Sequence, residues 1–379
     1  MSEIKVNSIK GVGASAAAIT VNNTDGTCTA NITNNLSNRN LIINGAMQVA
    51  QRGTSSTSTS YQTIDRFALL TQGVDEAPTQ AQADVASGTT PYTLGFRKAF
   101  KITNGNQTSG ADAPDHILIR YKIEAQDIAN SGWNYVSSSS NITLSFWIKS
   151  SVAQNFYFNL IAPDGTAQNY AYETGALSAD TWTKITKTIS GNSNLTFDNN
   201  SDTGLQLDFW AFAGTNVTAS GVALNQWGAY SSGNRMPDHT TTWYTTNDAT
   251  FEITGVQLEV SDHATDFEHR SFGQELDLCR RYFQIIGPSV GEGQSSSNIQ
   301  GTIQAIPFMR ANPSMAIIDN SNNVGLAGTG SNSVTSIGAI YVEGESLGMG
   351  GWAEMGGSGF TANRQYHIYG GKFSFSAEL

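Results

Sequence analysis

The residues of this chain that could carry out chemistry include five histidines and thirty-one carboxylates, and their spacing matches no reactive motif. None of the histidines, His116, His239, His263, His269 and His367, has a second histidine four residues away, as a zinc-binding helix requires. His263 and His269 are expected to be solvated or to cap a chain crossing. No Gly-x-Ser-x-Gly turn presents a nucleophilic serine. The glycine-rich stretch 348–359 lacks the Lys-Ser/Thr ending of a phosphate-binding loop. The sequence therefore predicts no catalytic residue, no metal ligand and no cofactor.

Two kinds of side chain could nevertheless act on a glycan. Cleavage would need a pair of convergent carboxylates, but Asp and Glu are scattered along the chain, and spacing does not show which of them meet. Recognition would use aromatic rings, which stack on the C–H faces of sugars. The aromatic candidates in polar stretches are Trp133, Tyr135, Trp227, Tyr230, Trp243 and Tyr244. Packing inside the protein is the alternative for each of them.

A second candidate surface lies in the glycine-rich stretch 344–359, which carries Met349, Trp352 and Met355. Flexible methionines around a rigid indole suit surface recognition. We expect these side chains to form an exposed apolar tip. A plug buried between symmetry-related chains is the alternative.

The elements that must position these residues are β-strands. Residues 40–260 show runs with a period of two, separated by Ser- and Thr-rich punctuation, and helical periodicity is nearly absent. The predicted strands of this part are 96–102, 117–123, 142–149, 155–161, 182–189, 205–212 and 250–260, and 125–129 could form one helical turn. Strands of this number and length predict two antiparallel sheets packed face to face.

The last of these strands is followed by a helix. In the strand, Val256, Leu258 and Val260 alternate with Gln257 and Glu259, which predicts one apolar and one polar face. Beyond a polar crossing, a Ser with a Gln three residues later forms a capping box at 271–274. Apolar residues at helical spacing then predict a connecting helix over 271–283.

Smaller units flank this central part. Residues 1–39 contain short alternating pieces that bury too little apolar area to fold alone, so they are expected to need a partner surface or neighbouring copies. Residues 287–379 form a second β unit, with strands predicted at 299–309, 314–318, 333–342, 360–368 and 371–379. The predicted domains are thus an arm (1–39), a sandwich (40–265), a connecting helix (266–286) and a small C-terminal β-domain (287–379).

Composition limits the possible partners. Charged residues make up 13% of the chain, and the formal net charge is −11. Because no Lys/Arg cluster supplies counterion release, nucleic acid is not expected as a partner. The sequence contains no apolar run long enough to predict a signal peptide or a membrane span. Cys28 and Cys279 lie in unlike contexts and are expected to be reduced thiols, with a disulfide as the alternative.

The stretch TGVQLEV at 254–260, followed by ATDFEHRSFGQELDLCRRYFQ, is similar to a joint found in many tail fibre proteins of tailed phages, especially marine ones. Further matching stretches are NLIINGAMQVAQRG (40–53), DRF (65–67), ITLSFWIKSS (142–151) and FSFSAEL (373–379). The resemblance implies a homotrimeric virion protein, assembled in the host cytoplasm and attached to tail or adaptor proteins through its N-terminal arm. It also implies adhesion to a bacterial surface glycan, without enzymatic activity.

The central part also resembles jelly-roll carbohydrate-binding modules, in which an Asn-Gly-containing first strand lies beside a late strand. Asn44-Gly45 and residues 253–258 occupy the matching places. Members of that family commonly hold a structural calcium with acidic residues there, whereas this chain has Ala46-Met47-Gln48 and Thr254-Gly255. Neutral side chains remove the anionic oxygens that calcium prefers. We therefore expect no calcium at this position.

Three other functions remain open at this point. A head fibre or capsid decoration protein could carry the same sandwich. A polysaccharide depolymerase would need a carboxylate pair in a groove, although no repeat typical of a β-solenoid is visible. A secreted cellular sugar-binding module would require a signal peptide, and the sequence predicts none.

Overall fold

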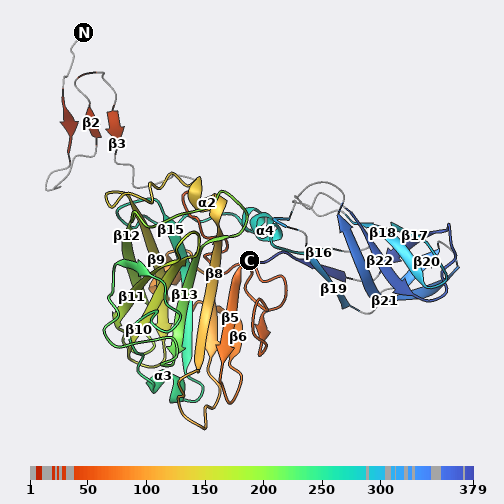
Figure 1. The fold of residues 1–379 in the computed structure, drawn as a ribbon, viewed down its shortest axis with the longest axis horizontal. Helices are drawn as coiled ribbons and strands as arrows, with labels where there is room; N and C mark the ends of the chain where they lie inside the picture. Colours follow the sequence, from red (N-terminus) through yellow and green to blue (C-terminus); the bar gives the residue numbers. More distant parts are fainter. Residues whose placement is uncertain are drawn as a thin grey trace.

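Strands that alternate apolar and polar residues are the main regular structure of the chain. The structure is a computed structural model and describes residues 6–10, 19–21, 24, 28–30, 38–286, 290–303, 309–311, 313–319, 323–326, 329–342, 351–369 and 372–379. As predicted, it is an all-β protein built around a jelly-roll sandwich (Figure 1). No helix in these ranges is long and apolar enough to cross a membrane.

Two six-stranded antiparallel sheets form the sandwich (Figure 1). Sheet I has the order β14 (Trp227–Ala229), β11 (Gln168–Ala176), β10 (Asn155–Ala162), β13 (Thr203–Ala213), β8 (His116–Glu124) and β5 (Phe67–Gln72). Sheet II has the order β12 (Thr183–Ser190), β9 (Asn141–Ser150), β15 (Thr250–Glu259), β7 (Lys98–Thr103), β6 (Thr79–Asp84) and β4 (Ser55–Ser56). Three short helices lie at the ends of these strands: α1 (Thr90–Thr93), α2 (Ala125–Ala129) and α3 (Thr242–Thr245).

Aromatic side chains fill the space between the two sheets. The ring of Phe146 on β9 lies 5.1 Å from that of Phe209 on β13, edge to face, and both side chains are fully buried. Full burial of one such ring stabilises the fold by about 1.5–3 kcal/mol. Trp147, the neighbour of Phe146, points to the other side of sheet II and packs against a smaller apolar cluster around Phe96. The period of two thus assigns Phe146 and Trp147 to opposite faces.

All seven strands predicted in this part are present, with ends shifted by a few residues, and so is the turn at α2. The prediction missed β4, β5, β6, β11 and β14. In β11, the outward-facing residues Asn169 and Ala171 alternate with the inward-facing Tyr170 and Tyr172. Amides and alanines weaken the apolar alternation on which strand prediction depends.

The opening of the sandwich differs from the expected strand. Residues 41–46 form no strand, and 43–46 form a turn. Their backbone nevertheless follows β15: Leu41 N–H donates to Leu258 O at 2.9 Å, and Val256 N–H donates to Gly45 O at 2.9 Å. A Cβ atom on residue 45 would lie 2.0 Å from the carbonyl oxygen of Val256. Gly45 is therefore required by this close approach, and no regular ladder forms here.

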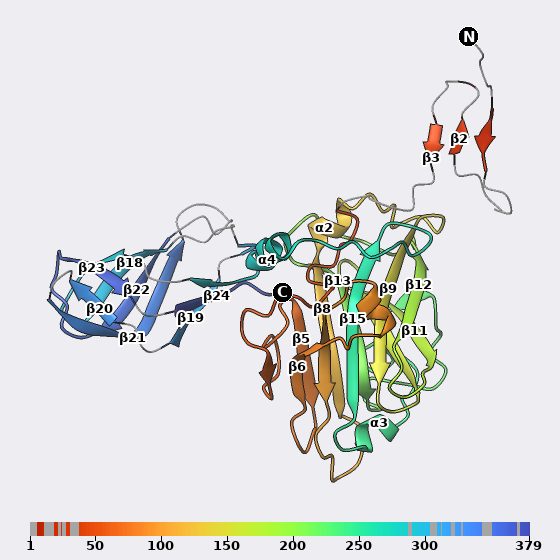
Figure 2. The same ribbon diagram turned by 180° about the vertical axis from the view of Figure 1, so that it is seen from behind.

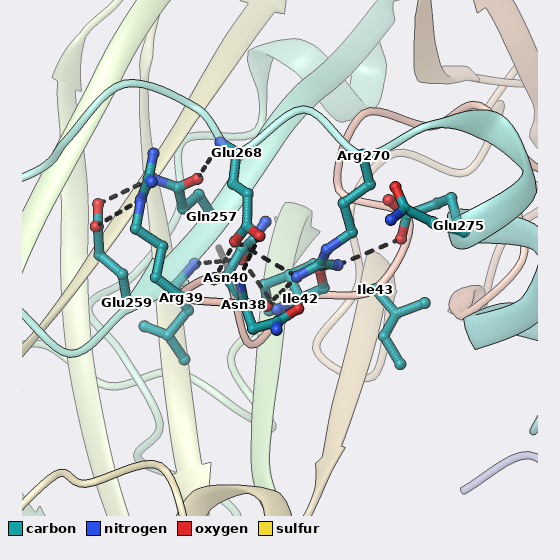
Figure 3. Close-up of polar contacts among 12 residues, drawn as sticks. Asn38, Arg39, Asn40, Ile42, Ile43, Gln257, Glu259, Glu268, Arg270 and Glu275 are labelled. Atoms are coloured by element: carbon teal, nitrogen blue, oxygen red, sulfur yellow. Dashed lines mark hydrogen bonds and ion pairs between the residues drawn. The ribbon is translucent and has the colours of Figure 1, made fainter. Parts of the chain in front are cut away.

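Polar side chains join the first and last segments of the sandwich where no regular strand ladder forms, and we call this joint the closure (Figure 3). Asn40 is buried, and its Oδ1 accepts from the N–H groups of Ile42 (2.9 Å) and Leu258 (3.0 Å), while its Nδ2 donates to the Val256 carbonyl (3.3 Å). The guanidinium of Arg270 donates to the Asn40 and Ile42 carbonyls. The first and last segments of the sandwich are thus joined through two side chains.

Arg270 also neutralises two carboxylates at this closure. Its guanidinium lies 3.6 Å from Glu268 and 3.5 Å from Glu275. Glu268 accepts from the backbone N–H groups of Asn38 and Asn40, and Glu275 from that of Asn44. Burial raises the pKa of Glu275, against the opposing effects of the Asn44 N–H and Arg270.

Gln257 and Glu259, which form the polar face of β15, do not face solvent. Both are at least 98% buried. Gln257 accepts from Glu268 N–H at 2.8 Å, and Glu259 accepts from Thr265 N–H at 2.9 Å. Arg39 pairs with Glu259 at 3.4 Å. The crossing segment folds back over the strand and satisfies its polar face, which strand periodicity cannot reveal.

The connecting helix α4 (Phe272–Arg280) begins with the predicted capping box, in which Ser271 and Gln274 bind each other's backbone N–H groups. The helix ends at Arg280 rather than at residue 283, and Phe283 opens strand β16. Cys279 is a free, fully buried thiol on this helix. The side chain of Cys28 lies outside the described residues.

The chain continues into smaller β units. One three-stranded sheet contains β16 (Phe283–Ile286), β24 (Lys372–Ser376) and β19 (Ser314–Asp319). A closed barrel follows, with β17 (Val290–Gly293), β18 (Asn298–Ile303), β22 (Gly351–Gly357), β21 (Thr329–Val342), β20 (Asn323–Leu326) and β23 (Gln365–Tyr369). At the N-terminus, β1 (Ser8–Ile9), β2 (Ile19–Val21) and β3 (Cys28–Ala30) form a separate sheet. Within the glycine-rich stretch 344–359, residues 351–357 form strand β22 of the barrel. Residues 343–350 lie outside the described ranges.

The C-terminus returns to the sandwich, as both views show (Figure 2). Glu378 pairs with Arg66 and, at 3.2 Å, with Arg52. The backbone N–H of Ala377 donates to Tyr282 O at 2.8 Å. Arg66 is almost fully buried, and its guanidinium stacks 3.4 Å from the centroid of the Tyr282 ring. The barrel is consequently tethered to the sandwich by both of its ends.

Replacing Asn40 by alanine removes three hydrogen bonds and leaves two buried N–H groups without an acceptor. We expect the free energy of unfolding of the sandwich to fall by about 2–4 kcal/mol. Urea denaturation followed by tryptophan fluorescence measures this change. Asn234→Ala, at an exposed asparagine, is the matched control and should be nearly neutral. Equal stability of the two variants would contradict the role assigned to Asn40.

Candidate functional site

The outer face of sheet I carries a row of polar residues directly opposite one another on neighbouring strands. Arg120 on β8 pairs in register with Asp208 on β13, which pairs with Asn159 on β10. Residues opposite each other lie on the same face of a sheet. Since Phe158 and Phe209 point into the core, their neighbours in the row point outward.

One half of this face is a buried hydrogen-bonded layer. Trp210 Nε1 donates to Asn159 Oδ1 at 2.7 Å, and Asn159 Nδ2 donates to Asn169 Oδ1 at 2.8 Å. Asn169 Nδ2 donates to the Arg235 carbonyl at 2.8 Å. These three side chains are more than 90% buried. Polar groups so buried require these partners.

The segment 214–241, between β13 and β15, covers that half. It contributes parallel bridges between Leu224 and Ala171 and between Thr218 and Met236. Met236 is fully buried against the sheet, and the guanidinium of Arg235 lies 5.8 Å from the Trp210 ring centroid. The cover therefore seals the β10–β11 side of the face.

The β8–β13 side remains partly accessible. We call its residues the polar stripe: Arg120, Lys122, Gln206 and Asp208. Arg120 binds both oxygens of Asp208 at 2.7 and 2.9 Å, and Gln206 donates to the same carboxylate at 2.9 Å. Although burial opposes it, the hydrogen bond and charge of Asp208 raise the pKa of Arg120.

Two half-buried tyrosines lie on the two sides of the polar stripe. Tyr61 follows Ser60, whose backbone bridges to Leu69 of β5 at the edge of sheet I, and the ring of Tyr230 lies 5.6 Å from the guanidinium of Arg235, the residue beside Trp210. The Tyr61 hydroxyl donates to the Leu379 carbonyl at 3.3 Å, and burial is the main reason that its pKa rises to about 12. Fixed amide, guanidinium and carboxylate groups beside aromatic rings can hydrogen-bond and stack with a polyhydroxylated ligand.

Three of the aromatic candidates do not reach any surface. Trp133, Trp243 and Tyr244 are at least 97% buried. Trp243 Nε1 donates to Thr250 O at 3.0 Å, and the Tyr244 ring stacks on Phe212 at 4.3 Å. The prediction that these three residues contact a ligand was wrong, and the alternative, that they pack inside the protein, is confirmed. Their polar flanks had indicated loops, but the indole and phenol pack inward with their polar tips satisfied.

Tyr135, Trp227 and Tyr230 are half-buried. Trp227 lies against Tyr170 and donates to Ser190 O at 2.9 Å, away from the polar stripe. Of the six aromatic candidates, Tyr230 alone flanks the stripe among the described residues.

Met355 lies in strand β22 of the barrel and is 99% buried, so its assignment to an exposed tip was wrong. The backbone of Trp352 is part of the same strand, opposite Thr302 and Tyr341. The side chain of Trp352 and all of Met349 lie outside the described residues. The glycines around these residues had indicated a loop, but barrel pairing incorporates them into a strand.

Sequence reasoning missed the polar stripe itself. A weak signal exists in strand β8, where Arg120 and Lys122 alternate with apolar residues and so share one face. The same holds for Gln206 and Asp208 in β13. Which strands become neighbours is a tertiary property, so the sequence could not show that the four converge.

The histidines have other roles. His269 Nε2 lies 2.8 Å from the Leu94 carbonyl, and His263 is exposed beside Asp262. Within the part of the chain that is described, no group of three His, Cys, Asp or Glu residues could hold a metal ion. His239 lines a pocket of about 90 Å³ near α3, together with Phe212, Thr218 and Asp238. Burial lowers the pKa of His239 to about 3.

No family model matches the chain, and no curated protein matches it in sequence. Solved structures similar to it include a proposed sugar-binding protein from Bacteroides thetaiotaomicron (12% identity, 59% of this chain and 100% of that one, TM-score 0.31). Another is the N-terminal cellulose-binding domain of Cellulomonas fimi β-1,4-glucanase C (10%, 56% and 98%, TM-score 0.27). A third is a family 11 carbohydrate-binding module of a Clostridium thermocellum cellulase (12%, 57% and 98%, TM-score 0.25). The likeness is one of fold, and no ligand follows from it.

His239 should make stability sensitive to acid. Its pKa of about 3 in the folded state lies below the unfolded value near 6.5, so the unfolded chain binds a proton that the folded chain does not. The free energy of unfolding therefore falls as the pH drops below 6.5, by about 2 kcal/mol from this group between pH 7 and pH 5. His239→Gln should remove that part of the pH dependence in urea denaturation. The exposed control His263→Gln should retain it, and identical pH profiles for both variants would refute the assignment.

Proposed function

We propose that this chain is a phage virion fibre protein, carried on the tail, that attaches to the host cell surface by recognising a glycan. The observation that carries the proposal is the polar stripe with its flanking tyrosines on the outer face of sheet I. Convergent donors and acceptors beside aromatic rings match the hydroxyls and the C–H faces of a sugar. The sequence resemblance to tail fibres supplies the virion context.

Attachment in this proposal involves no bond cleavage. Two carboxylates, those of Glu268 and Glu275, converge around Arg270. Both are bound by the Arg270 guanidinium and by backbone N–H groups. Asp208 is held by Arg120 and Gln206. Carboxylates held in this way are suited to structure and recognition. We expect incubation with host polysaccharide to release no new reducing ends.

A homotrimer suits this role because three copies of a weak site act together. Once one copy is bound, the others bind at a high effective concentration, so avidity exceeds the affinity of a single site. Residues 1–39 would provide the contact with tail or adaptor proteins. The net charge of −11 is compatible with a glycan partner and unfavourable for nucleic acid.

The oligomeric state can be tested directly. A homotrimer should have a mass of three times 40.4 kDa in light scattering coupled to size exclusion. A chain lacking residues 1–39 tests whether the arm contributes to assembly, and we expect a lower trimer content. A full-length monomer at micromolar concentration would argue for a free-standing module.

The binding face can be tested with one aromatic residue. Tyr230→Ala should weaken adsorption of the labelled protein to host cells by about threefold to tenfold, because one stacking contact of roughly 0.5–1.5 kcal/mol is lost. Tyr92→Ala, at a half-buried tyrosine beside sheet II, is the matched control. Unchanged adsorption by Tyr230→Ala would contradict binding at this face. Absence of adsorption by the unmodified protein would contradict the proposed function as a whole.

A further inference from the structure

Lys122 holds an unusual position on the polar stripe. It lies on β8 opposite Gln206 of β13, two residues from Arg120, and its side chain is half-buried on the outer face of sheet I. Its backbone carbonyl accepts from Arg66 at 2.7 Å. Its ammonium makes no ion pair or hydrogen bond with any residue in the described ranges, although an ammonium offers three donors.

The arginines whose charges act on this lysine are already occupied. Arg120 is held by Asp208, and Arg66 by Glu378. Arg310 donates to the Ser201 carbonyl at 2.6 Å and to the Ala377 carbonyl at 3.0 Å. The nearby carboxylates are therefore taken up by guanidinium groups, and the charge of Lys122 is left over.

This arrangement is unfavourable in the free protein. Partial burial lowers the pKa of Lys122, and repulsion from Arg120, Arg310 and Arg66 lowers it further, against the attraction of Asp208. A cation so placed is stabilised by an added anion, which contributes charge-assisted hydrogen bonds.

The surroundings of Lys122 indicate what the anion would be attached to. Gln206 uses one amide hydrogen for Asp208 and retains its carbonyl oxygen. Tyr61, beside the β5 edge of sheet I, and Tyr230, next to Arg235, add aromatic surface. An amide and aromatic rings near one cation that has no ion pair among the described residues suit a sugar ring that carries one negative group. A polyphosphate chain would require a larger cationic surface.

We propose that Lys122 marks a subsite for the anionic substituent of an acidic glycan, either the carboxylate of a uronic acid or a sulfate ester. This inference rests on the proposed function and specifies its ligand class. Lys122 donates to the anionic oxygens, while Gln206 and the flanking tyrosines contact the ring that carries them. Arg120 stays paired with Asp208 and keeps the stripe in place.

Calorimetry with three probes of equal length tests this subsite: oligogalacturonate, a sulfated galactan oligosaccharide and a neutral galactan oligosaccharide. At least one acidic probe should bind about tenfold more tightly than the neutral probe, and its affinity should fall with added salt. Lys122→Gln should weaken that acidic probe about tenfold and leave the neutral probe unchanged. Lys122→Arg keeps the charge and should retain most of the affinity.

Lys184→Gln is the matched control, because it makes the same charge change at an exposed lysine of β12 in sheet II. It should leave every affinity unchanged. Equal binding of acidic and neutral probes, no binding of any acidic probe, or equal effects of the Lys122 and Lys184 variants would each overturn the subsite. Adsorption of the unmodified protein to host cells is measured in parallel. Adsorption that persists while the subsite fails leaves the proposed function intact.

Discussion

The closure between the first and last segments of the sandwich is the constraint on which the remaining structure depends. Residues 41–46 run beside β15 without forming a regular strand, so Asn40 and Arg270 provide the hydrogen bonds that a ladder would supply. The same guanidinium balances Glu268 and Glu275, which in turn hold the opening segment and α4. A buried ionic centre of this kind favours one arrangement over alternatives, because any loss of partner leaves an uncompensated charge.

That closure brings three parts of the chain to one end of the sandwich. The chain reaches the sandwich at Asn38, which donates to Glu268, and leaves it through α4. Its C-terminus returns to Arg66 through Glu378. Helix α3 lies at the opposite end (Figure 1).

The outer face of sheet I is divided into a closed half and a partly accessible half. On its β10–β11 side, Asn159, Asn169 and Trp210 satisfy one another beneath the segment 214–241, so that side is closed. On its β8–β13 side, Arg120 and Asp208 form a fixed pair, and neighbouring polar groups remain accessible. Charges held in place before a ligand arrives lose little entropy on binding, which favours selective recognition even at modest affinity.

The sequence by itself determined the elements: seven strands of the sandwich, the capping box at Ser271, and the division of Phe146 and Trp147 between opposite faces. These follow from local backbone geometry, in which periodicity and capping involve residues only a few positions apart. Tertiary structure alone decided which strands became neighbours, and so which polar residues met in the stripe. It also buried Trp243, Met355 and the polar side of β15, because burial depends on segments that fold over a strand from distant parts of the chain.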